Sequence, residues 1–227
     1  MTHPRRPVAL LVAAGVVFLV LVALGIWQVQ RLAWKTDLIA RVDARVAAEA
    51  VPAPGPAEWA GLTAENAEYR RVTVTGEYAP DSDVLVQAVT ERGPGFWVMT
   101  PLTTDSGWTL LVNRGFVAGD RRDDRPLPAG AQTVTGLLRL SQPGGAFLRA
   151  NDPGAGRWYS RDTQAIAATL GLPEVAPYFI DAERMGEGQP IGGLTVIAFR
   201  NHHLSYALTW FAMAGGLVVL TVFALRR

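Results

Sequence analysis

The chain has 227 residues, of which 49% are hydrophobic, and its formal net charge at pH 7 is +1. It is too apolar for an intrinsically disordered protein, and the near-zero charge provides no basic face, so we expect no nucleic-acid partner. The absence of cysteine excludes disulfides, thiolate metal sites, thiol nucleophiles and covalent c-type haem attachment.

The first element is an uncharged run of 20 residues, Val8–Trp27. A run of this length can cross a hydrocarbon core of about 30 Å, so we predict a transmembrane helix over 8–27 after a tail of residues 1–7. A cleaved signal peptide is the alternative. Its apolar core is typically about 7–15 residues long, whereas this run continues into GIWQVQRLAWK, which offers no small-residue cleavage site.

Beyond Trp27 the helical spacing continues through Leu38 to Val42, and the proline-rich stretch Val51–Trp59 is expected to end the helix. Short segments rich in valine, threonine and aromatic residues follow, and they predict a mainly antiparallel sheet. The predicted strands are 71–78, 83–89, 96–102, 108–117, 133–140, 177–182 and 194–200. Asp105-Ser106-Gly107 predicts a hairpin turn, and one helix is expected over 162–173 with Asp162 as its N-cap.

The last element, Leu204–Leu225, is a second uncharged run of 22 residues, followed directly by Arg226 and Arg227. We predict a second transmembrane helix over 204–225 and a short tail of 226–227. The terminal arginines favour a cytoplasmic C-terminus, and long loops translocate largely regardless of their charge. The expected fold is therefore a membrane protein whose two terminal transmembrane helices flank a mainly antiparallel α+β domain, residues 28–203, outside the cytoplasm.

A search for catalytic motifs finds no phosphate loop, metalloprotease helix or nucleophile elbow. We therefore expect no enzyme activity. A membrane-bound hydrolase is the least favoured hypothesis, because no set of acid, base and nucleophile is recognisable. The segment Asn151–Asp162 could bind a ligand, but a turn held by its Asn and Asp side chains is the simpler interpretation.

The most informative residues lie at the two membrane entries. Helical spacing places His203 on one face with Tyr206 and Trp210, whereas His202 points elsewhere. A neutral imidazole here could ligate haem iron, or it could be an ordinary polar residue at the interface. At a similar depth on the other helix, Trp27 and Arg31 share a face that continues through Trp34 and Lys35. These residues are either a cofactor-facing surface or an aromatic belt with basic neighbours.

These two motifs, together with several segments of the domain, resemble the surfeit locus protein 1 family. The resemblance covers nearly the whole chain and rests on the order of its pieces: LGIWQVQRLAWK, GEYAPDSDVLV, GFWVMTPL, LLVNRGFV, GLLRL, NDPGAGRWYSRD, PYFIDA and RNHHLSYALTWF. Phe116 stands where the family often has tryptophan.

The resemblance implies a multi-pass protein of the inner or plasma membrane that assists cytochrome c oxidase assembly, with both termini in the cytoplasm and its domain in the periplasm. It implies haem a as a transient cofactor, with His203 as the metal ligand in the pattern Asn-x-His-Leu-x-Tyr. The remaining expected cofactor-binding residues are Trp210, Tyr206, Arg31 and Trp27. Implied partners are the oxidase catalytic subunit, the lipid bilayer and, as a further candidate, haem a synthase. A scaffold that stabilises an oxidase intermediate without touching haem remains the alternative.

Overall fold

The computed structural model describes residues 5–144, 149–184, 188–195, 197, 199 and 201–226. The chain divides into two compact units, which are treated separately below. One consists of Met1–Arg41 with Ile197–Arg227, and the other of Val42–Val196. Residues 1–4 of the expected tail and Arg227 lie outside the described residues.

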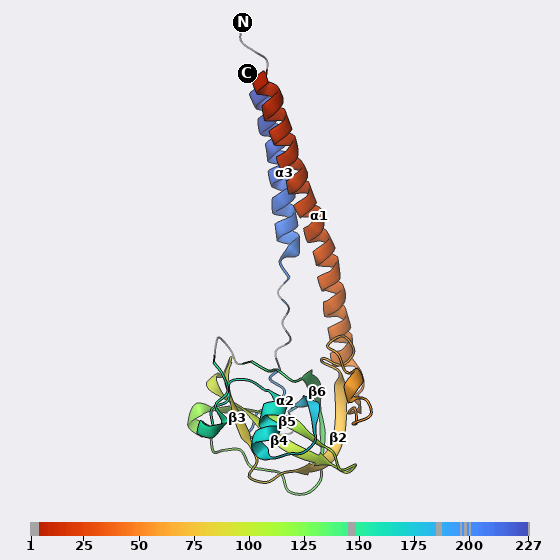
Figure 1. Cartoon of the computed structure of the whole chain (residues 1–227), viewed down its shortest axis with the longest axis vertical. Helices are drawn as coiled ribbons and strands as arrows, with labels where there is room; N and C mark the ends of the chain where they lie inside the picture. The colour runs from red at the N-terminus through yellow and green to blue at the C-terminus, as the bar shows by residue number, and fades with distance from the viewer. Residues whose placement is uncertain are drawn as a thin grey trace. The chain divides into compact units, whose positions relative to one another are not determined.

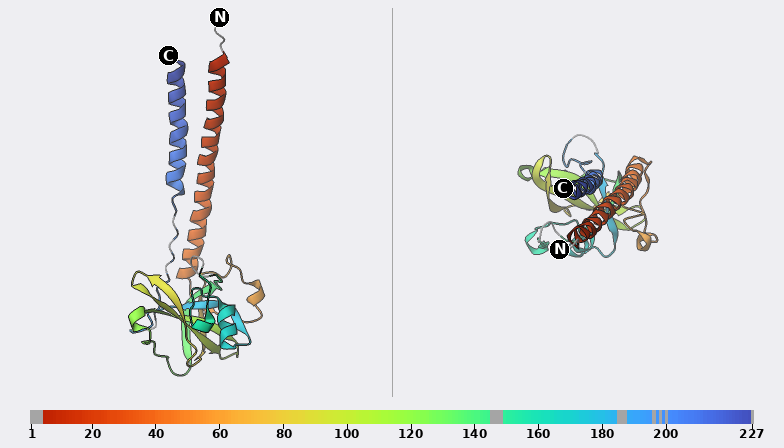
Figure 2. Two further views of the ribbon diagram at one scale, coloured as in Figure 1. Left: turned by 60° about the vertical axis from the view of Figure 1, so that its left-hand side comes forward. Right: turned by 90° about the horizontal axis from the view of Figure 1, so that it is seen from above.

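The first unit is a pair of long helices, α1 (Arg5–Ala47), which continues beyond Arg41 into the second unit, and α3 (His203–Leu225). They lie side by side and antiparallel, so that the start of α1 and the end of α3 are neighbours (Figures 1 and 2). By length and composition both could cross a membrane, and only 6% of the most apolar window of each is buried. The helix thus continues past Trp27, as its periodicity predicts, and ends before the proline-rich stretch.

The second unit is a domain built around one sheet. Its elements are β1 (Val51–Pro52), β2 (Arg71–Tyr78), β3 (Val84–Thr90), β4 (Gly93–Thr104), β5 (Thr109–Ala118), β6 (Gln132–Leu140), α2 (Thr163–Leu170) and β7 (Val175–Ala182), with short 3-10 turns at Trp59–Gly61, Gly119–Arg121 and Pro153–Ala155. Six of the seven predicted strands are therefore present, with bounds shifted by three residues at most. The predicted hairpin joins β4 to β5, where Gly107 has φ +87°.

The sheet closes on itself into a barrel. Its strand order is β1-β2-β6-β7-β5-β4-β3, and an additional pairing joins β2 to β4. The strands β2, β6, β7, β5 and β4 thus form a ring, antiparallel except for the parallel β5–β7 pair. Gly76 lies where β2 changes partner, and a Cβ there would come within 2.2 Å of the Thr103 carbonyl oxygen. Closure at this point therefore depends on glycine.

The barrel interior is filled by apolar side chains from all five ring strands, and a second core lies outside the wall. Leu110 and Tyr178 belong to the interior cluster, while the adjacent Leu111 and Phe179 point the other way and pack with Ile166 of α2. Because both faces of β5 and β7 are covered, both strands are buried along nearly their whole length. Helix α2 begins at the predicted N-cap, Asp162, whose carboxylate accepts from two backbone amides.

Two sequence-based assignments were wrong. The segment 194–200 is not a strand at Leu194, Thr195, Ile197 or Phe199, and its other residues lie outside the described part of the chain. Two of its described residues make side-chain contacts: the Thr195 hydroxyl donates to Asp181, and the centre of the Phe199 ring lies 5.0 Å from Lys35 Nζ. The two-residue strand β1 was missed, because the prolines around it hide any strand pattern.

Candidate functional site

The contact between α1 and α3 follows a seam of small, apolar and a few polar side chains. On α3 the seam residues are half-buried or buried and are spaced alternately by four and three: His203, Ala207, Trp210, Ala214, Leu217 and Thr221. On α1 the same spacing runs through Ala14, Phe18, Leu21, Gly25, Gln28, Leu32 and Lys35. This spacing is that of a left-handed coiled coil, in which each helix presents one stripe to its partner. We call this stripe pair the helix seam.

One glycine sets how closely the two helices approach. A Cβ placed on Gly25 would lie 2.6 Å from the nearest ring carbon of Phe211, so a larger residue there would require that ring or the helix to move. Gly15, three turns earlier on α1, has open space around it. The two helices are therefore close together at Gly25, one turn before Gln28. This proximity brings the Gln28 side chain against the start of α3.

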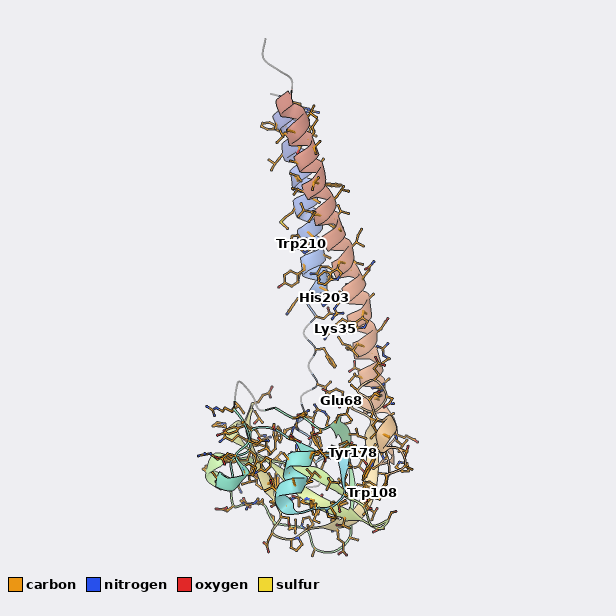
Figure 3. All side chains as sticks on the ribbon, viewed as in Figure 1. Lys35, Glu68, Trp108, Tyr178, His203 and Trp210 are labelled. Carbon is orange, nitrogen blue, oxygen red and sulfur yellow. The ribbon has the colours of Figure 1, made fainter. Side chains whose placement is uncertain are left out.

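His203 is the first residue of α3, and its partner on α1 is Gln28. The ring nitrogen Nδ1 lies 2.7 Å from the side-chain oxygen Oε1 of Gln28, and Gln28 is only 9% exposed. With its amide oxygen facing Nδ1, Gln28 is placed to accept a hydrogen bond from the ring, an arrangement that favours the tautomer protonated on Nδ1. Figure 3 shows His203 at the start of α3, with Lys35 close by on α1. The adjacent His202 is exposed.

The remaining predicted site residues divide between the helix seam and its outer sides. Trp210 lies in the seam, whereas Tyr206 is 56% exposed and Trp27 53% exposed. Arg31 is also exposed, and its guanidinium lies 4.0 Å from the ring centroid of Trp34. On the α1 side the structure therefore brings Gln28, and not Trp27, against His203. We call Trp27, Arg31 and Tyr206 the rim residues.

The domain contains two buried networks of charged side chains, and the first is centred on Asp181 of β7. The Asp181 side chain is only 3% exposed, and it forms ion pairs with Arg139 at 3.0 Å and Arg161 at 2.9 Å. Asn113 and Thr195 donate further hydrogen bonds to its two oxygens. Burial lowers the pKa of the Arg161 guanidinium, and the charge of Asp181 opposes that effect. Each charge is satisfied by partners from the strands β5 and β6 and from the segments around Arg161 and Thr195, as a buried ion requires.

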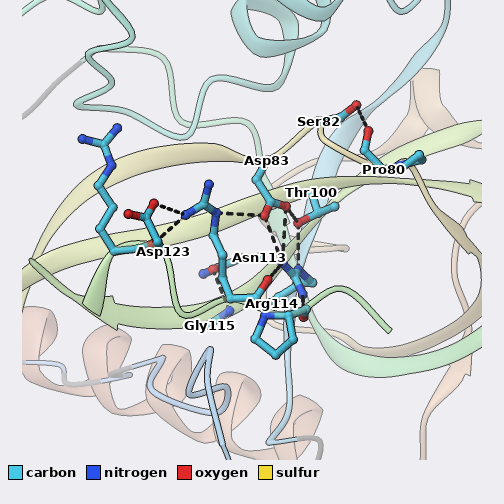
Figure 4. A network of polar contacts seen from close by, with 11 residues as sticks. Pro80, Ser82, Asp83, Thr100, Asn113, Arg114, Gly115 and Asp123 are labelled. Carbon is cyan, nitrogen blue, oxygen red and sulfur yellow. Dashed lines mark hydrogen bonds and ion pairs between the residues drawn. The ribbon is translucent and has the colours of Figure 1, made fainter. Parts of the chain in front are cut away.

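The second network joins β3, β4 and β5 around Asp83 (Figure 4). The Asp83 carboxylate accepts hydrogen bonds from Arg114 at 3.1 Å and from Arg125 at 3.1 Å. The Thr100 hydroxyl also donates to it. Arg114 also donates to the Thr100 hydroxyl and to backbone carbonyls of the loop before β6. The network thus fixes this loop against the barrel wall.

The sequence model of the SURF1 family matches residues 15–215 of the chain, which include most of α1, the whole domain and the first half of α3. The chain belongs to the SURF1 family. Surfeit locus protein 1 of Homo sapiens is 35% identical over 214 residues, which cover 84% of this chain and 69% of the human protein. The mouse protein of the same name is 34% identical over 212 residues, covering 84% and 67%. The SURF1-like protein of Monosiga brevicollis is 33% identical over 222 residues, covering 90% and 83%.

The motifs by which the chain resembles the SURF1 family meet one another in the structure. Asn113 of LLVNRGFV, Arg139 of GLLRL, Arg161 of NDPGAGRWYSRD and Asp181 of PYFIDA form the first network. The NDPGAGRWYSRD segment itself is a turn, as predicted: the Asn151 side chain accepts from the Tyr159 and Ser160 amides. In the domain, therefore, these motifs hold the barrel together.

Within the SURF1-family helix motif LGIWQVQRLAWK, sequence analysis missed Gln28. The aromatic and basic residues of the motif suit a cofactor and were singled out for that reason, whereas the Gln28 amide was not considered. The usable signal was a polar residue at a seam position: Gln28 lies one turn after Gly25 and one heptad before Lys35. Arg200, which precedes Asn201 in the second motif, lies outside the described residues.

Proposed function

We propose that this protein assists the assembly of cytochrome c oxidase by holding haem a at the helix seam and helping its transfer into the catalytic subunit. The single observation that carries the haem proposal is the geometry of His203. It lies in the seam, and its Nδ1 lies 2.7 Å from the side-chain oxygen of Gln28, an arrangement in which Nε2 would serve as the ligand atom. Membership of the SURF1 family supports the oxidase-assembly role.

The donor chemistry at this point fits haem iron. Haem iron, when bound, offers an axial position that an imidazole nitrogen can fill. A histidine that ligates a metal usually donates its other ring N–H to an oxygen acceptor, which fixes its tautomer and orientation. Gln28 provides such an acceptor at 2.7 Å. His203 would therefore ligate through Nε2.

The other proposed contacts are made by Trp210 and by the rim residues. Trp210 lies two turns along the helix seam from His203 and supplies flat apolar surface. Trp27 and Tyr206 supply exposed aromatic surface, and the exposed Arg31 would pair with haem carboxylates near water. An exposed ion pair contributes little binding energy, so Arg31 would orient haem a more than retain it.

The proposed setting is the inner or plasma membrane. Both termini would be cytoplasmic, the two helices would contact lipid, and the domain would lie in the periplasm or an equivalent space. The large exposed apolar side chains of α1 and α3 support an apolar surrounding. The protein acts in this proposal as a chaperone of respiratory-chain biogenesis and not as an enzyme. Its partners are the oxidase catalytic subunit and, as a second candidate, haem a synthase.

The proposal is tested by the haem content of two adjacent histidine variants. Wild type, His203→Ala and His202→Ala are purified in detergent from cells that make haem a. Bound haem is measured by pyridine haemochrome on matched amounts of folded protein. We expect His203→Ala to lose most of the haem and His202→Ala to keep it, because only His203 lies in the seam.

Two other outcomes have definite meanings. Equal haem retention in wild type and His203→Ala would remove the ligand claim and favour a scaffold that never touches haem. Loss in His202→Ala with retention in His203→Ala would keep the cofactor and reassign its ligand. Arg31→Ala is expected to reduce retention less than His203→Ala does.

A further inference from the structure

Gln28 is a buried amide that directly follows the apolar run Val8–Trp27 of α1. It is 9% exposed, and its side-chain oxygen lies 2.7 Å from Nδ1 of His203. A buried polar group is costly unless it is hydrogen-bonded, and the cost of leaving it unpaired is greatest in an apolar setting. A glutamine at this position therefore needs a specific partner, and the partner it has is His203.

We infer that Gln28 is the positioning residue of the haem site: its amide oxygen holds His203 as the Nδ1-protonated tautomer and sets the electron-donating strength of Nε2. This inference rests on the function proposed above, and it assigns to Gln28 a role separate from that of the ligand. A stronger acceptor at Nδ1–H makes Nε2 a more basic ligand, which stabilises ferric over ferrous iron. The acceptor at residue 28 should thus tune the reduction potential of the bound haem.

The helix seam explains why this amide can be placed accurately. Gly25 allows α1 to approach α3 closely at Phe211, and Gln28 follows one turn later on the same stripe. The rotation of α1 about its axis is fixed by this stripe, so the Gln28 oxygen is presented to the start of α3. A polar residue at a seam position also selects one register of a helix pair. The contact would therefore align the two helices before haem arrives.

The tautomer itself can be measured without haem. Full-length protein labelled with ¹⁵N-histidine is purified in detergent from cells that lack haem a, and the His203 signal is assigned by its loss in His203→Ala. We expect the Nδ1-protonated tautomer in the wild type and a shift towards the Nε2-protonated form in Gln28→Leu. A predominantly Nε2-protonated His203 in the wild type would overturn the inference, because Nε2 could then not be the prepared ligand atom.

With haem a bound, two substitutions should act in opposite directions. Gln28→Leu removes the acceptor at similar volume and should weaken haem binding about 10–100-fold, as is typical when the hydrogen-bond partner of a metal ligand is lost. Its residual haem should have a raised midpoint potential. Gln28→Glu supplies a stronger acceptor, and it should retain haem and lower the potential. A residue that only packs the helices would not shift the potential in opposite directions.

A matched control comes from the same helix. Gln30 is exposed, so Gln30→Leu changes an identical side chain two residues away and should leave affinity, potential and tautomer unchanged. Wild-type affinity and potential in Gln28→Leu, with haem lost in His203→Ala, would overturn the positioning role while leaving the ligand intact. Full haem retention in His203→Ala would instead overturn the proposed function, and with it the tuning of potential by Gln28.

Discussion

Asp181 shows what single buried charges do in this domain. Its carboxylate, 3% exposed, is the shared partner of two arginines from different elements, Arg139 and Arg161. Removing such a group lowers stability mainly because its charged partners stay buried. An unpaired buried ion costs far more folding free energy than the loss of a surface ion pair. The strand β7 that carries Asp181 also joins β5 to β6, so the network links three strands of the ring.

We expect Asp181→Ala to destabilise the domain by about 3–5 kcal/mol, because it removes the carboxylate paired with the buried Arg161 and leaves Arg139 with Glu68 as its ion-pair partner. The measurement is chemical denaturation of the detergent-purified chain, followed by tryptophan fluorescence. The control is Asp123→Ala, which removes an ion pair whose carboxylate side chain is 96% exposed. Equal midpoints for the two variants would show that the Asp181 network does not stabilise the barrel.

At the scale of elements, the helix pair depends on one close approach. The seam of α1 and α3 contains small residues at several positions, but only Gly25 among the helical glycines described is pressed against a neighbour, the ring of Phe211. A larger residue there must displace either that ring or the whole helix. The contact between Gln28 and His203, one turn away, should be sensitive to this displacement.

We therefore expect Gly25→Leu to separate the start of α3 from α1, and Gly15→Leu, at a position with open space, to leave the pair intact. The chain has no cysteine, so a double variant, Gln28→Cys with His203→Cys, carries two reactive thiols. Crosslinking of these thiols by a short bifunctional reagent reports whether positions 28 and 203 lie close together. Most of the crosslink should be lost when Gly25→Leu is added. A yield unchanged by Gly25→Leu would mean that the helices are held together elsewhere along the seam.

At the scale of the whole molecule, the arrangement of apolar helices at both ends has a topological consequence. Two crossing helices return the chain to the side from which it started, so both termini would share one compartment and the barrel would occupy the other. The arginines after α3 favour a cytoplasmic C-terminus. This orientation is part of the proposed function.

Alkaline phosphatase, which is active only outside the cytoplasm, tests that orientation. Inserted at Ala129, an exposed loop residue before β6, it should be active, and fused after Arg227 it should be inactive. Green fluorescent protein at the same two sites should give the complementary result. The reverse pattern at both sites would refute the orientation while leaving two crossing helices in place.

Local patterns in the sequence were sufficient for the elements that depend on local interactions. The apolar runs, the strands from Arg71 to Ala182, the turn at Gly107 and the N-cap of α2 at Asp162 follow from hydrophobic periodicity, turn chemistry and capping, which act over a few residues. The different directions of His202 and His203 also belong here, since helical geometry alone separates them. Membership of the SURF1 family rests on the order of the motifs and needs no coordinates.

Only the tertiary structure decided what distant segments do together. Closure of the barrel between β2 and β4 could not be predicted from either strand, because the decisive feature is a close approach of the two strands at Gly76. The partners of Asp181 come from positions 113 to 195, and the partner of His203 lies 175 residues away on α1. Such pairings carry no local signal, since the free energy that selects them arises only when the segments pack against each other.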